Sequence, residues 1–106
     1  MTEAILILTN FPDKESASKL AHKLIDEQLA ACVNIMSTCT SIYRWQDVTE
    51  SADETPVFIK TRQKHYKQVE ELIKSMHPYE LPEVIIVPIT GGLPAYLQWI
   101  IEETRP

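Results

Sequence analysis

The chain has 106 residues and a formal net charge of −5 at pH 7, and 44% of its residues are hydrophobic. This size allows one domain with a single core, and the negative charge argues against nonspecific binding to nucleic acid or anionic lipid, which needs basic patches. No apolar run approaches the roughly 18 residues that span a bilayer. The chain begins without a basic leader region, so we expect a soluble, cytoplasmic protein.

The first elements expected along the chain are a strand and a helix. The continuous apolar run at residues 4–8 predicts a strand that is covered on both faces. Asp13 is a candidate N-cap for a helix that we expect to run to about Gln28, because apolar residues recur at helical spacing from Ala17 onward.

A long hairpin is expected next. Residues 32–47 are rich in β-branched and aromatic types and contain neither proline nor glycine, which predicts a long strand. Residues 55–61 predict its partner strand. The polar residues 49–54 are interpreted as the connection between the two.

The second half of the chain repeats the helix and strand patterns. Residues 64–75 predict a helix, and residues 84–90 predict the last strand. Pro94 fits the first turn of a short closing helix through Ile101. The order strand, helix, strand, strand, helix, strand is typical of an α+β, ferredoxin-like split βαβ sandwich, here with an extended hairpin and an extra C-terminal helix.

Two features of this fold predict an oligomer. A straight strand over residues 32–47 would extend about 50 Å, whereas a compact domain of this size is roughly 35 Å across. The last strand is expected at the sheet edge, where Pro88 is tolerated, yet it is apolar on both faces and invites pairing with another chain. The alternative is a bent hairpin that folds back on its own monomer.

The most informative segment runs from Met76 to Glu83, because its two prolines stiffen it. Met76 beside His77 offers the soft thioether and imidazole that suit copper, and Glu80 and Glu83 offer oxygen ligands for other divalent ions. A structural interpretation stays open: the prolines stop a helix and start a strand, His77 forms hydrogen bonds, and Met76 continues the apolar stripe of the preceding helix. His22 and His65 are expected to be exposed.

A second group of candidates lies on the hairpin. Tyr43 and Trp45 share one face because they are two residues apart, and Glu54 and Lys60 share a face because they are separated by an even number of residues, six. Whether the pairs meet depends on a register that the sequence does not fix. They predict either a subunit interface with its own salt bridge or a polar ligand pocket. No nucleophile elbow, phosphate loop or paired-carboxylate motif is present, so we do not expect an enzyme.

The chain resembles the CutA family of divalent-cation tolerance proteins. The resemblance is carried in order along nearly the whole chain by Thr9, Pro12-Asp13, Leu29-Ala30-Ala31-Cys32-Val33-Asn34-Ile35, Ser41-Ile42-Tyr43-Arg44-Trp45, Glu54, Ile59-Lys60-Thr61, His77-Pro78-Tyr79-Glu80, Pro82-Glu83 and Tyr96-Leu97-Trp99-Ile100. It implies a ferredoxin-like subunit in a tight homotrimer that is similar to the PII signalling proteins. It also implies a role in tolerance of copper and other divalent cations.

The function expected from the sequence is therefore divalent-cation tolerance by a homotrimer. The candidate metal ligands are His77, Met76, Glu80 and Glu83, and copper or another divalent cation is the candidate ligand, with no further cofactor required. The alternative is a PII-like sensor that binds a small ligand or a protein partner in clefts between subunits. The residues expected at those clefts or interfaces are Tyr43, Trp45, Glu54, Lys60, Tyr79 and Trp99.

Overall fold

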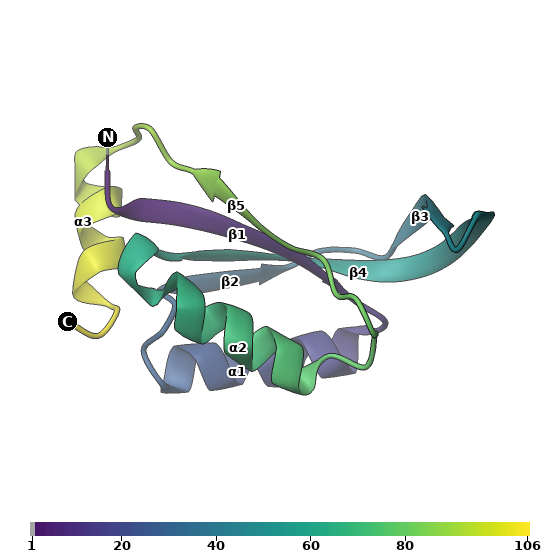
Figure 1. Cartoon of the computed structure of the whole chain (residues 1–106). Helices are drawn as coiled ribbons and strands as arrows, with labels where there is room; N and C mark the ends of the chain where they lie inside the picture. The colour runs from purple at the N-terminus through teal and green to yellow at the C-terminus, as the bar shows by residue number, and fades with distance from the viewer. Residues whose placement is uncertain (1) are drawn as a thin grey trace.

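The computed structural model describes residues 2–106 and shows one antiparallel sheet with two helices on one face and a third at its end (Figure 1). The strands follow the order β2-β4-β1-β5, and β3 pairs with β4, which confirms the ferredoxin-like fold and the edge position of the last strand. The elements are β1 (Ala4–Phe11), α1 (Lys14–Asp26), β2 (Cys32–Ile35), β3 (Cys39–Trp45), β4 (Val48–Arg62), the 3-10 turn η1 (Gln63–His65), α2 (Tyr66–Met76), β5 (Val84–Pro88) and α3 (Pro94–Glu102). No helix within residues 2–106 is long and apolar enough to cross a membrane.

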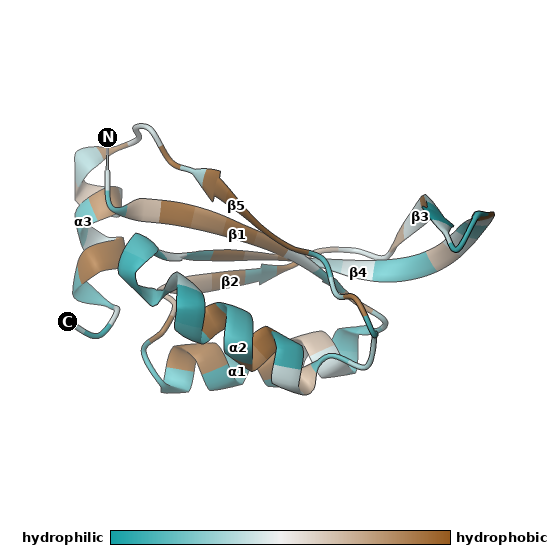
Figure 2. Ribbon diagram, in the orientation of Figure 1, coloured by the Kyte–Doolittle hydropathy of each residue, from teal (hydrophilic) through white to brown (hydrophobic). Residues whose placement is uncertain are grey.

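The core lies between the sheet and helices α1 and α2. Alternate residues of β1 and β4 point toward the helices, and in this layer Ile7, Val57 and Ile59 are fully buried. The helices contribute Leu20, Leu24, Val69 and Ile73 to the same cluster, as their 3.6-residue spacing predicts. The apolar stripes on α1, α2, β1 and β5 are visible in Figure 2.

Helix α1 begins at the predicted cap. The Asp13 carboxylate accepts a hydrogen bond from the backbone N–H of Ser16 at 2.7 Å, which satisfies one of the free donors of the first turn. This bond favours the charged form, so the pKa of Asp13 is lowered. The helix ends slightly earlier than expected, because Gln28 adopts a positive φ of 56° just after it.

In residues 2–106, helices α1 and α2 leave the other face of the sheet uncovered, and α3 contacts it only toward one end (Figure 1). Leu8 lies opposite Phe58 on one side and Ile85 on the other, and Leu6 lies opposite Val87, so these apolar side chains share that face. They are half-buried or exposed, with 48% exposure at Ile85. We call this surface, made of Leu6, Leu8, Phe58, Ile85 and Val87, the open face.

The hairpin differs from the prediction in two ways. Residues 49–54 are not a connection, because β4 runs without a break from Val48 and the turn is made by Gln46 and Asp47 at φ of 48° and 66°. The long first strand is interrupted at residues 36–38, between β2 and β3. The interruption lies opposite Pro56, which has no N–H to give to the ladder and accepts a single bond from the Met36 N–H at 2.9 Å. The hairpin extends beyond the rest of the domain (Figure 1).

The prediction of an exposed His65 is wrong. Its side chain is buried, and Nε2 donates to the backbone oxygen of Arg105 at 2.7 Å. Arg105 in turn donates to the backbone oxygen of Glu27 from both Nε and Nη2, at 3.0 and 2.6 Å. The segment after α3 is thereby tied to the end of α1 and to η1, and burial lowers the pKa of His65.

Candidate functional site

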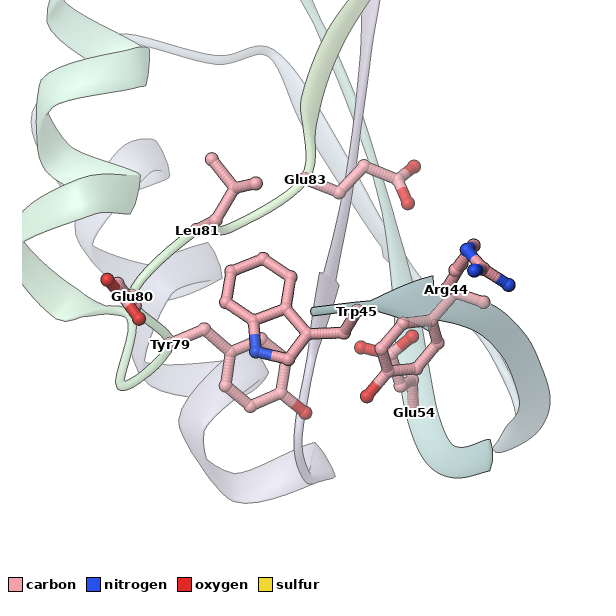
Figure 3. Close-up of a pocket in the computed structure, with 8 residues that line it drawn as sticks. Arg44, Trp45, Glu54, Tyr79, Glu80, Leu81 and Glu83 are labelled. Atoms are coloured by element: carbon pink, nitrogen blue, oxygen red, sulfur yellow. The ribbon is translucent and has the colours of Figure 1, made fainter. Parts of the chain in front are cut away.

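A hollow of about 430 Å³ lies between the β3–β4 hairpin and the stiff link of residues 77–83 that follows α2 (Figure 3). The hairpin supplies Tyr43, Arg44, Trp45 and Glu54, and the link supplies Tyr79, Glu80, Leu81 and Glu83. We call this the hairpin–link pocket. It brings together six of the residues that the sequence had assigned to two separate sites.

The hairpin register explains why Glu54 reaches the pocket. Cys39 pairs with Glu54, Tyr43 with Glu50 and Trp45 with Val48. Side chains directly opposite in an antiparallel pair lie on the same side, and residues two apart along a strand share a side. Glu54 therefore lies on the same face of the hairpin as Tyr43 and Trp45.

His77 fixes the position of the link. Its Nε2 is 2.5 Å from the backbone oxygen of Asn10, and the backbone N–H of Tyr79 donates to its Nδ1 at 3.1 Å. A carbonyl oxygen only accepts and an amide N–H only donates, so the proton of a neutral His77 lies on Nε2. The ring also contacts the rings of Phe11 and Tyr79 at centroid distances of 4.5 and 4.6 Å. His77 thus joins the end of β1 to the wall of the pocket.

The electrostatics of the pocket are mainly negative. Its lining contains three carboxylates and one guanidinium, that of Arg44. Arg44 Nη2 lies 3.9 Å from Oδ1 of Asp47, a turn residue that does not line the pocket. Glu83 accepts a hydrogen bond from the Asn10 side chain at 3.0 Å. The pKa of Tyr79 is raised, first by burial and then by the negative charge of Glu54, because both disfavour the phenolate.

Three of the predicted site residues lie elsewhere. Lys60 is on β4 but six residues from Glu54, with its Nζ 5.7 Å from the centroid of the Tyr96 ring. Trp99 is on α3 and contacts the same Tyr96 ring at a centroid distance of 5.4 Å. The side chain of Met76 packs against the core, as its place in the apolar stripe of α2 indicates.

Two residues of the pocket were missed from the sequence. Leu81, which precedes Pro82, is 69% exposed and lines the pocket. Arg44 was noted only within the family resemblance, although its position between Tyr43 and Trp45 could have placed it near the same surface. Exposure of a large apolar side chain beside aromatic residues is the signal that would have found Leu81.

The chain belongs to the CutA1 family, since the family model described as "CutA1 divalent ion tolerance protein" matches residues 5–103. A protein from Thermus thermophilus named "Divalent-cation tolerance protein CutA" is 40% identical over 104 residues, covering 98% of this chain and 99% of its own. The Arabidopsis thaliana "Protein CutA, chloroplastic" is also 40% identical, but the match spans only 56% of that longer protein.

Solved structures show the same relationship. The crystal structure of CutA1 from Shewanella sp. SIB1 superposes with a TM-score of 0.95 at 41% identity and covers 99% of this chain and 98% of its own. The structure of the T. thermophilus protein gives a TM-score of 0.93 at 38% identity over 96% of this chain and 99% of its own. Fold and sequence therefore place the chain in a family of divalent-cation tolerance proteins.

Proposed function

We propose that the chain acts in divalent-cation tolerance as a homotrimer that binds copper or a related divalent ion beside the hairpin–link pocket. The proposal that the chain binds a metal ion rests on the hydrogen bonds of His77. A histidine that binds a metal through one nitrogen commonly donates its other N–H to a backbone carbonyl, which fixes the tautomer and the ring. His77 donates from Nε2 to Asn10 in this way, so Nδ1 is the nitrogen whose electron pair could bind a metal in place of the Tyr79 N–H.

The fit of the predicted ligands is partial. His77 Nδ1 accepts a hydrogen bond of 3.1 Å from the Tyr79 amide, which a metal would have to replace. Glu80 and Glu83 line the pocket on the same link and offer oxygen ligands, whereas Met76 would have to leave the core. Within residues 2–106 no three His, Cys, Asp or Glu side chains converge as a ready metal cluster. The proposed site therefore forms only when the link adjusts around the ion.

The test is a calorimetric copper titration of the protein and its His77→Ala variant near pH 7 and near pH 5. We expect saturable binding that weakens at least tenfold in the variant and near pH 5, because a protonated imidazole cannot coordinate. His22→Ala is the matched control, since His22 is an exposed histidine on α1. Equal binding by the wild type and His77→Ala would reject this site.

The trimer proposal is supported by the open face and by the edge strand β5. An apolar surface on an uncovered sheet beside an unpaired edge is typical of a subunit interface. We expect light scattering to give three times the 12.2 kDa of one chain. Ile85→Glu, at 48% exposure on the open face, should dissociate the assembly, whereas Ile25→Glu, at 42% exposure on α1, should not. A monomeric wild type at micromolar concentration would contradict the proposal.

A second candidate is a PII-like sensor that binds a small ligand or a protein partner at clefts between subunits. The hairpin–link pocket favours it, because a hollow of about 430 Å³ lies in the usual size range of ligand sites. We propose a binding role in both cases, without catalysis, in keeping with relatives named as tolerance proteins. A cytoplasmic location stays a prediction, because one relative is named chloroplastic and an Archaeoglobus fulgidus structure is named periplasmic.

A further inference from the structure

Asn10 contacts the link of residues 77–83 at both of its ends. Its backbone oxygen accepts the hydrogen bond of His77 Nε2 at 2.5 Å, and its side-chain Nδ2 donates to Glu83 Oε1 at 3.0 Å. The two bonds use separate groups of Asn10, since a carbonyl oxygen only accepts and an amide nitrogen only donates. The part of the link between the two ends forms one wall of the hairpin–link pocket, where Figure 3 shows Tyr79 and Glu83.

The strand register explains why Asn10 is available for both contacts. The β1–β5 ladder ends with the pair of Thr9 and Val84, so Asn10 is the first residue of β1 beyond that ladder. Its backbone oxygen is therefore not used by β5 and accepts from His77. Continuing the register by one position places Asn10 opposite Glu83, and side chains in opposite positions lie on the same side of a sheet. Both bonds thus follow from the place where β5 begins.

We propose that Asn10 is the positioning residue of this site, which orients two of the proposed metal ligands, His77 and Glu83, and keeps the link against β1. The inference rests on the proposed function and adds the residue through which these ligands are oriented. Histidine and carboxylate ligands are commonly held by hydrogen bonds to residues behind them, and loss of such a partner weakens metal binding by about 10- to 100-fold. Asn10 does not line the pocket, so it acts through the two side chains that it holds.

The first test needs no metal. Asn10→Ala removes the side-chain amide but keeps the backbone oxygen that His77 uses, and hydrogen exchange of the Tyr79 amide, which donates to His77 Nδ1, reports on the link. We expect this exchange to accelerate roughly threefold to tenfold, the change that the loss of one net hydrogen bond predicts, while the amide of Leu8 in β1 stays unchanged. Glu83→Ala changes an exposed side chain and should reproduce the effect.

A control and a double variant show whether Asn10 acts through Glu83. Asn34→Ala is the matched control, because Asn34 is the other asparagine of the chain and lies on β2, which β4 separates from β1. It should leave the exchange of the Tyr79 amide unchanged. The double variant Asn10→Ala with Glu83→Ala should exchange no faster than the faster single variant, because both changes remove the same hydrogen bond. Additive effects would overturn the inference.

Copper titration tests whether this positioning serves the metal site. Asn10→Ala should weaken copper binding about tenfold in the wild-type background. It should have no further effect in a Glu83→Ala background, whereas the full effect should remain in a Glu80→Ala background. Glu80 is the comparison because it lies on the same link and also has an exposed side chain.

The outcomes distinguish this inference from the proposed function. A wild type that binds copper, with neither exchange nor affinity changed in Asn10→Ala, would overturn the inference and leave the metal site in place. Faster exchange with unchanged copper affinity would confine Asn10 to a structural role and would also overturn it. A wild type that binds no copper would overturn the proposed metal site, whereas the exchange of the Tyr79 amide would still support or reject the holding of the link by Asn10.

Discussion

The body of the molecule (residues 2–35 and 55–106) and its projecting hairpin (residues 39–54) share strand β4 but are stabilised differently. In the body, Ile7, Val57 and Ile59 have no exposed surface. In the hairpin, Ile42 is 74% exposed and Val48 is 55% exposed. An isolated two-stranded ribbon without a covered face is marginal in water, so the hairpin relies on its ladder, its turn and any partner that covers it.

The largest expected effect comes from the same truncation in both regions. Ile7→Ala should lower the free energy of unfolding by about 2–5 kcal/mol, because it leaves a cavity in a closed core. Ile42→Ala should cost no more than about 0.5 kcal/mol once the chain is diluted to monomer. Denaturant unfolding at several protein concentrations measures both, and equal losses at every concentration would contradict the distinction.

A second change acts on the turn of the hairpin. Gln46 and Asp47 both adopt a positive φ, which is costly for residues with a side chain and is the geometry that Asn-Gly prefers in two-residue hairpins. Replacing the pair by Asn-Gly should stabilise the hairpin by about 1 kcal/mol. Amide hydrogen exchange should slow in β3 and remain unchanged in β1. No change in β3 would mean that the turn does not limit hairpin opening.

A smaller effect is expected from two buried threonines of the body. Thr9 Oγ1 is buried and has no hydrogen-bond partner within residues 2–106, whereas Thr61 Oγ1 donates to the backbone oxygen of Leu29 at 2.6 Å. Thr9→Val should raise the free energy of unfolding by up to about 1 kcal/mol, and Thr61→Val should lower it by about 1 kcal/mol. Thermal unfolding of the two variants distinguishes them, and a shift of the same sign in both would refute this assignment.

The smallest effect is on acid stability through His65. Burial lowers the pKa of His65 in the folded state below its ordinary value of about 6.5, so the unfolded chain binds the proton more readily. The stability that the buried, neutral His65 contributes is fully present above the ordinary pKa of about 6.5, and it is lost as the pH falls through the lowered pKa of the folded state. His65→Gln should flatten the pH dependence of unfolding in that window, while His22→Gln should not. An unchanged profile in His65→Gln would assign the acid sensitivity to another group.

The fold was largely predictable because the apolar residues of the body follow clear helix and strand patterns. Apolar residues recur at helical spacing in α1 and α2, and β1 and β5 are continuous apolar runs. The hairpin was mispredicted because it is exposed on both sides, so residues 48–54 carry no apolar alternation and look like a loop. Its turn also lacks glycine or asparagine, the usual signal of a tight hairpin.

The candidate site was only partly predictable. Aromatic and acidic residues on the hairpin and the link were identified separately, but their meeting depends on the pairing of Cys39 with Glu54, which no local pattern specifies. The burial of His65 was missed because its partner is the backbone oxygen of Arg105, forty residues further along the chain. Because the acceptor is a backbone oxygen, the residue types in the sequence do not reveal it.

Strand β4 has a mechanical consequence. Strand β4 is continuous from Val48 to Arg62, although its partners change: residues 48–54 pair with β3 and residues 55–62 pair with β1. The change of partner lies between Glu54 and Thr55, so we expect any bending of the hairpin relative to the body to occur there. The same strand carries the hairpin tip at one end and, toward the end of the sheet where α3 lies, Lys60 beside the Tyr96 ring, so one continuous backbone joins these two parts of the molecule (Figure 1).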